Sequence, residues 1–108
     1  MAKFIEFEVT GNGTSWENGK RVIGVDDIVG VYQVAPANVK IFTASSIEVT
    51  ITLSIDKDSY SAPTLTDGRV AEAINDALTI DTVGLKSKVT LPKDDNGAQL
   101  YANDIAIS

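Results

Sequence analysis

Two adjacent aspartate pairs, Asp26–Asp27 and Asp94–Asp95, are the residues of this chain that come closest to an acid–base site. Two carboxylates held together can divide the roles of general acid and general base. In a strand, however, neighbouring side chains point to opposite faces, and in a turn an aspartate accepts hydrogen bonds from nearby backbone N–H groups. Both pairs lie in turn contexts, so we expect structural roles for them.

Histidine and cysteine are both absent from the 108 residues. The commonest general base is therefore missing, and so are thiol nucleophiles, Ser–His–Asp triads and zinc–thiolate sites. The sequence predicts no catalytic, cofactor-binding or metal-ligating residues and implies no small-molecule ligand. We expect a protein that is not an enzyme.

A calcium loop is the nearest metal-binding pattern. Asp56 and Asp58 fit positions 1 and 3 of an EF-hand loop, and Asp67 falls at position 12. Such a loop also needs an oxygen ligand at position 5 and glycine at position 6, where this chain has Tyr60 and Ser61. We expect a solvated loop, and whether Asp56 and Asp58 contribute to a binding site is left open.

Trp16 is a candidate for recognition, because it lies in a polar loop near Lys20 and Arg21. An exposed tryptophan beside cations can stack on a base or a sugar. A loop tryptophan more often folds back over the edge of the core, and we expect that arrangement here, with any binding role left open. The 15 acidic and 9 basic residues give a net charge of -6, which disfavours nucleic acid as a partner.

The elements that must position these residues are mostly strands. In residues 47–55, the apolar side chains Ile47, Val49, Ile51, Leu53 and Ile55 alternate with Glu48, Thr50, Thr52 and Ser54. This pattern predicts a strand with one apolar and one polar face. Alternation or short apolar runs predict further strands over 4–9, 21–25, 28–34, 39–43, 86–91 and 100–107, with a tight turn at 94–97.

One segment has the spacing of a helix. Its apolar stripe consists of Val70, Ala73, Ile74, Ala77 and Leu78. Thr66 or Asp67 can accept a hydrogen bond from the first free backbone N–H groups, so the helix should begin after one of them. Because the stripe is made of alanines and small aliphatic residues, the helix should lie close to a sheet.

Together these elements predict a single domain over residues 1–108, of the α+β class and mainly β. We expect a strongly bent antiparallel sheet or small barrel with one α-helix against its opening. The alternative is a β-sandwich with the helix at one end. Glutamates occupy the first residues, where a signal peptide would be apolar, and no run approaches the roughly 18 apolar residues of a membrane span. We therefore expect a soluble cytoplasmic protein without a membrane partner.

Residues 22–31, VIGVDDIVGV, followed by a turn and by residues 39–43, VKIFT, resemble the bent-strand meander of Sm-like small-barrel proteins. The whole chain also resembles short, threonine-rich proteins encoded in marine phage and metagenomic sequences. The resemblance implies a small barrel and a ring, in the host cytoplasm or the virion if the source is a phage. Asp27 can stand for the acidic residue of Sm-like RNA binders, but Lys40–Ile41 lacks their glycine, so RNA binding does not carry over.

The function we expect is that of a structural or assembly protein, of a kind that phages encode, which forms homo-oligomers through strand edges. A Sm-like nucleic-acid-binding barrel is the alternative. The final strand carries neither lysine nor proline, the residues that protect edge strands from pairing with another chain. If the first or last strand is an edge, pairing with a second copy buries Ile105 or Ile107. In the competing arrangement, the first and last strands pair within one chain.

Overall fold

The computed structural model describes residues 4–24, 28–44, 46–79 and 86–107. In chain order the elements are β1 (Phe4–Val9), the 3₁₀-helix η1 (Ser15–Glu17), β2 (Gly19–Gly24), β3 (Ile28–Ala35), β4 (Asn38–Thr43), β5 (Glu48–Ser54), α1 (Arg69–Thr79), β6 (Lys86–Lys88) and β7 (Tyr101–Ile107). The described part of the chain is therefore mainly β with one α-helix, as predicted. The strand expected over 86–91 is shorter, since β6 ends at Lys88.

The strands form a mixed sheet in the order β2-β1-β7-β5-β4-β3, with β6 paired to β1. The prediction of an antiparallel sheet is wrong at β1, which runs parallel to β6 and meets β7 in parallel at Val9 and Ala102. Parallel neighbours need long connections, and the elements from β2 to α1 all lie between β1 and β6 in the chain. Among the described residues the sheet is not closed, because the order ends at β2 and β3; a small barrel is not confirmed.

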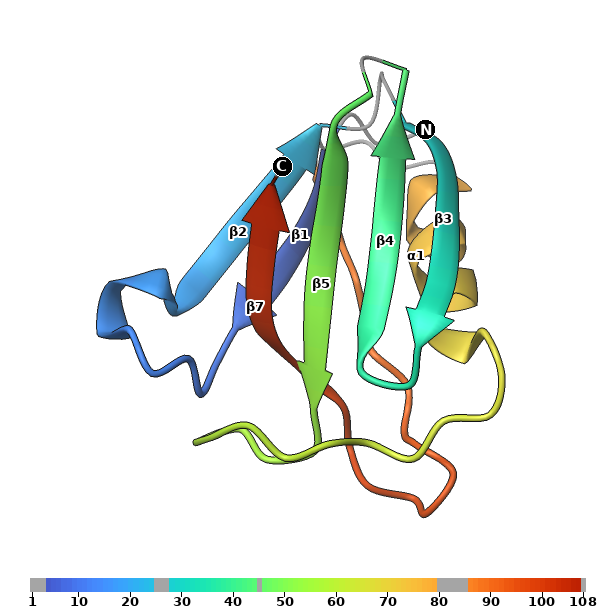
Figure 1. Ribbon diagram of the computed structural model, residues 1–108. Coiled ribbons are helices and arrows are strands. Elements are labelled where there is room, and N and C mark those ends of the chain that lie inside the picture. The colour runs from blue at the N-terminus through green and yellow to red at the C-terminus, as the bar shows by residue number, and fades with distance from the viewer. Residues whose placement is uncertain (1–3, 25–27, 45, 80–85, 108) are drawn as a thin grey trace.

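Figure 1 shows β7, β5, β4 and β3 side by side, with α1 behind β3 and β4 and with β2 leaning away. The buried side of α1 consists of Val70, Ala71, Ile74 and Ala77. The helix contacts β3 as well as β1 and β6, so it fills the space between the two ends of the bent sheet. Small side chains permit this close approach, as the sequence predicted.

Asp67 caps the helix. Its Oδ1 accepts a hydrogen bond from the backbone N–H of Arg69 at 3.1 Å. Of the two candidates that the sequence offered, Thr66 instead donates its hydroxyl to Asp95 at 2.8 Å. A side-chain oxygen before the first turn satisfies one of the N–H groups that a helix leaves without a partner.

The core lies between the sheet and α1. Its largest fully buried apolar side chains are Ile5, Phe7, Val9, Val39, Ile41, Ile51, Leu53, Val70, Ile74 and Leu100. The alternation predicted for residues 47–55 is confirmed from Glu48 to Leu53, whereas Ile47, expected on the apolar face, lies before β5 and is 42% exposed. Ser54, which the pattern placed on the polar face, is instead fully buried, because the 56–61 loop folds over it and bonds to its hydroxyl.

Candidate functional site

Asp94 is a structural carboxylate. It is only 4% exposed, and its Oδ1 accepts hydrogen bonds from the backbone N–H groups of Asn96 (3.0 Å) and Ala98 (2.8 Å). Its Oδ2 accepts a third from Thr64 at 3.2 Å. Burial raises the pKa of Asp94, but these backbone donors and the nearby Arg69 charge outweigh it and hold the pKa below its usual range. A carboxylate with both oxygens engaged in this way is not available as a base or a metal ligand.

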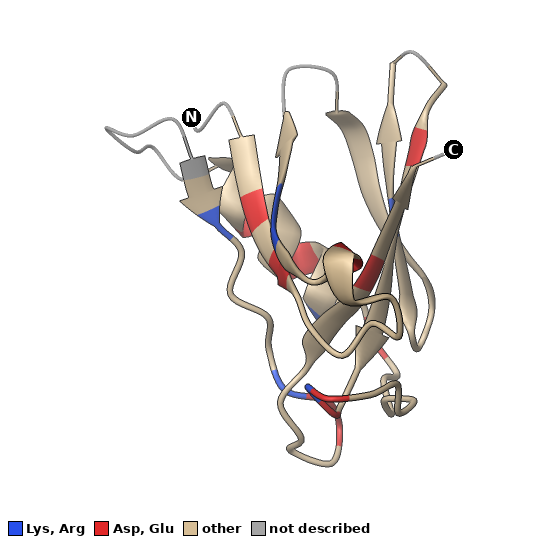
Figure 2. Cartoon of the chain, turned by 90° about the vertical axis from the view of Figure 1, so that its left-hand side faces the viewer, with Lys and Arg blue, Asp and Glu red and all other residues tan. Residues whose placement is uncertain are grey.

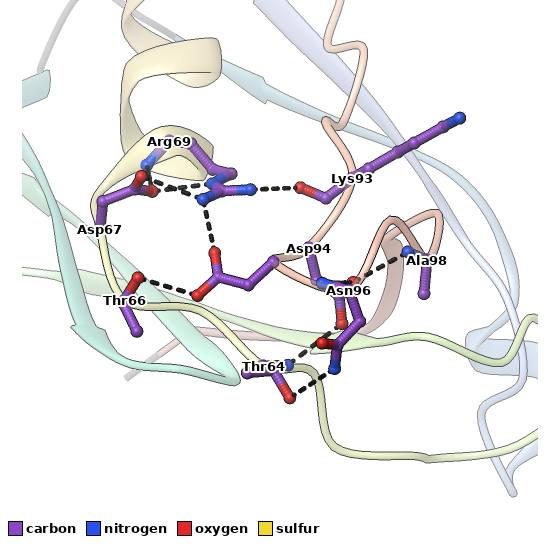
Figure 3. Close-up of polar contacts among 9 residues, drawn as sticks. Thr64, Thr66, Asp67, Arg69, Lys93, Asp94, Asn96 and Ala98 are labelled. Carbon is purple, nitrogen blue, oxygen red and sulfur yellow. Dashed lines mark hydrogen bonds and ion pairs between the residues drawn. The ribbon is translucent and has the colours of Figure 1, made fainter.

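Arg69 joins the same turn to the start of α1 (Figure 3). Its guanidinium donates to both carboxylate oxygens of Asp67, at 2.8 and 3.0 Å, and also to Asp95 and to the backbone carbonyl of Lys93. The side-chain hydrogen bond from Arg69 lowers the pKa of Asp67, and the bond with Asp67 raises that of Arg69. The structural role expected for Asp94–Asp95 agrees with these contacts.

The Asp56–Asp58 loop is also held by its own hydrogen bonds. Asp56 accepts from the backbone N–H of Asp58 at 2.8 Å and from the Ser59 hydroxyl at 3.2 Å. The buried Ser54 hydroxyl organises the loop from below, because it accepts from the N–H groups of Asp56 (3.1 Å) and Ser61 (2.9 Å). The alternating pattern hid this role, since it assigned Ser54 to the solvent face.

Within the described ranges, no three acidic side chains gather closely enough to hold a metal ion. The other aspartate pair of the sequence analysis, Asp26–Asp27, lies outside the described residues. No helix in the described part of the chain has the length and apolar character to cross a bilayer.

Trp16 does not fold back over the core. It lies in η1 and is 81% exposed, so the arrangement expected from the sequence is wrong. The three-residue helix turns it outward, and none of the residues of η1 is buried. Of the two neighbouring cations, Arg21 is bound by Glu17 in an ion pair at 2.6 Å, which leaves Lys20 to face solvent.

The strand order ends at β2 and β3, so neither the first nor the last strand stands at an end of it. β1 lies between β2 and β6, and β7 pairs along its length with β5 and touches β1 at Val9. The first and last strands therefore meet within one chain. Ile107 is nevertheless 71% exposed, at the end of β7.

The two edges differ in chemistry. β2 contains Lys20 and Arg21, charges of the kind that blunt an edge strand. β3 is eight residues long, contains no charged residue, and leaves Val29, Tyr32 and Val34 half or more exposed. Figure 2 shows acidic and basic segments interspersed along the other strands. The sequence signal for this edge was the uncharged run at 28–35. An uncharged strand marks an exposed edge only when the order of the strands in the sheet is known.

Tyr32 shapes the surface beside this edge. Its ring covers Gly30, where an added Cβ would lie 2.6 Å from the ring, and it meets Phe42 of β4 edge-on at 5.5 Å. A shallow groove of about 490 Å³ runs along β3 on the side of the 65–68 segment. The edge thus presents an unpaired strand, an aromatic surface and room for neighbouring side chains.

No protein-family model, curated protein or solved structure matches the chain.

Proposed function

We propose that this chain is a non-enzymatic assembly protein whose copies associate through the outer edge of β3. The observation that carries the proposal is that this edge strand is long, uncharged and apolar on its exposed side chains. Unpaired N–H and C=O groups on such a strand bind another strand, and natural monomers prevent this with charges or proline. The engaged carboxylates of the 94–95 turn agree with a role without catalysis.

The pairing we favour is β3 with β3 of a second copy. A two-fold axis brings the same strand from both chains into an antiparallel pair and closes the assembly at two copies. Because β3 carries no charge, no like charges oppose each other in this pair. The ring implied by the Sm-like resemblance instead requires β3 of one copy to pair with β2 of the next.

Light scattering at micromolar concentration tests this proposal. We expect a mass of twice the 11.5 kDa of one chain. Val29→Lys with Val34→Lys should reduce it to one chain, because lysines on an edge strand oppose pairing. Val22→Lys, an exposed valine on β2, is the matched control and should leave the dimer intact. If Val22→Lys also breaks the assembly, the copies pair head to tail; a monomeric wild-type chain rejects self-association.

The exposure of Trp16 favours a second candidate, nucleic-acid binding, with Lys20 as the nearby unpaired cation. A net charge of -6 opposes it. Trp16 is the only tryptophan of the chain, so its fluorescence reports on this site alone. We expect no quenching by micromolar single-stranded RNA at low salt. Quenching that salt reverses and that Lys20→Glu abolishes would establish this second function instead.

A further inference from the structure

A groove of about 550 Å³ opens where β1 changes its neighbour in the sheet. β1 pairs with β6 through Phe4–Glu6 and then meets β7 at Val9. Between these contacts the chain leaves β6, turns back at the Lys93–Gln99 bridge and returns as β7. The volume lies in the range of about 300–1,000 Å³ that is usual for small-molecule sites.

The walls of the groove are largely apolar and are held in place by the fold. The apolar lining consists of Phe7, Val89, Leu91, Leu100, Tyr101 and Ala102. The side-chain amide of Gln99 joins the outgoing and returning segments, since it donates to the carbonyls of Leu91 (2.8 Å) and Leu100 (3.1 Å). A ligand therefore meets walls that are already formed, which reduces the entropy lost on binding.

The polar side chains of the lining give the groove a local positive charge. Lys57 and Lys88 both line it, and the side-chain ammonium group of neither forms an ion pair or hydrogen bond with any residue that the structure describes. Glu8 is the acidic residue of the same lining. Two cations against one acid contrast with the net charge of -6 of the whole chain.

The hydroxyl of Thr10 is a further unused polar group in this lining. It is buried and has no hydrogen-bond partner among the described residues. Buried polar groups are paired in most proteins, so a hydroxyl of this kind is suited to a ligand or a bound water molecule. Because Thr10 belongs to the lining, a small shift of this side chain would add a hydrogen-bond donor to the two lysines.

We propose that the groove binds a small amphipathic anion: a monomeric molecule with an apolar body and one carboxylate or sulfonate group. The apolar body packs against Leu91, Leu100 and Tyr101, and Lys57 and Lys88 attract the anionic group. A free molecule suits the site better than a membrane surface. A groove between two segments of the protein can hold one apolar ligand, whereas a bilayer presents a flat surface.

Calorimetric titration with decanoate, below its micelle-forming concentration, tests the site. We expect saturable one-to-one binding, and at least about tenfold weaker binding of decyltrimethylammonium, which has the same chain and the opposite charge. The Lys57→Glu/Lys88→Glu variant should bind decanoate at least about tenfold more weakly. Lys20→Glu/Lys93→Glu makes the same change in net charge outside the groove and should bind like the wild type.

Thr10→Val removes the hydroxyl and keeps a side chain of similar size, so it tests the hydroxyl independently of the apolar walls. It should weaken decanoate binding while leaving the circular dichroism spectrum unchanged. Three results overturn the proposal: no binding of decanoate, equal affinity for the cationic probe, or an equal loss in both lysine double variants. Binding to phosphatidylglycerol vesicles without binding to decanoate also overturns it and assigns the groove to a membrane surface. None of these outcomes depends on whether the chain self-associates.

Discussion

Replacing Ile51 with alanine should lower the free energy of unfolding by about 3–4 kcal/mol, because it leaves a cavity in the middle of the sheet. Ile51 is fully buried, and its neighbours across the sheet are Val39 on β4 and Ile105 on β7. Strands on both sides are fixed by their ladders, so they cannot close the space. A small domain has about 5–15 kcal/mol in total, and the variant therefore loses a large share of its stability.

Urea denaturation followed by far-ultraviolet circular dichroism measures this loss, with an unchanged dependence of the free energy on urea. Trp16 fluorescence is a poor reporter here, because that side chain is already exposed in the folded state. Ile107→Ala is the matched control: the same truncation at an exposed position of the same sheet should change stability by no more than about 0.5 kcal/mol. Equal losses in both variants would contradict the position of the core.

The parts of the fold that depend on local pattern could be predicted from the sequence. The alternation around Ile51 gave β5 to within a residue at each end, and the apolar stripe gave α1 and three of its four buried residues, Val70, Ile74 and Ala77, but not Ala71. Both patterns work because they reflect the geometry of one element, with side chains repeating every two residues in a strand and about every 3.6 in a helix. The turn at 94–97 was predictable for the same reason, and Gly97 does adopt a positive φ of 81°.

Sheet order was beyond this reasoning, because it depends on contacts between residues far apart in the chain. The pairing of Val9 with Ala102, and of Phe4–Glu6 with β6, places β1 and β7 inside the strand order, with a single residue pair between them. No local pattern distinguishes an internal strand from an edge, so the sequence left open whether the terminal strands are edges or meet within one chain. The burial of Ser54 under the 56–61 loop is equally invisible to a strict alternation, because the loop lies outside the strand.

The sequence did not reveal the candidate site at the edge of β3 for this same reason. Val29, Tyr32 and Val34 belong to a strand that the sequence did predict, but their significance comes from the absence of a further strand beyond β3 in the described sheet. The groove beside β1 likewise brings Lys57 and Lys88 together from segments on either side of α1. Conversely, Asp94 and Asp95, one of the two aspartate pairs that the sequence singled out, are occupied by structural hydrogen bonds, as expected for a turn.

Replacing Asp94 with asparagine should lower the melting temperature at neutral pH by on the order of 10 °C. An amide oxygen can still accept from the N–H groups of Asn96 and Ala98, but the amide nitrogen then faces the N–H of Thr64, and two donors oppose each other. The charge that Arg69 stabilises is lost as well. Asp76→Asn, at an exposed position of α1 whose carboxylate bonds to no described residue, is the matched control and should leave the melting temperature within about 2 °C.

The difference between wild type and Asp94→Asn should also depend on pH in a direction that the structure fixes. The pKa of Asp94 is lower in the folded chain than in the unfolded one, so the unfolded state takes up its proton first as the pH falls. The contribution of Asp94 to stability is therefore complete above about pH 4, the ordinary range of an aspartate, and declines as the pH falls through the lowered value. Melting curves at steps from pH 7 to pH 2 should show the two proteins converging at the acidic end. A difference that stays constant across this range would mean that Asp94 acts through its shape alone, and a difference that grows towards low pH would mean that burial, rather than the three backbone donors, decides its ionisation.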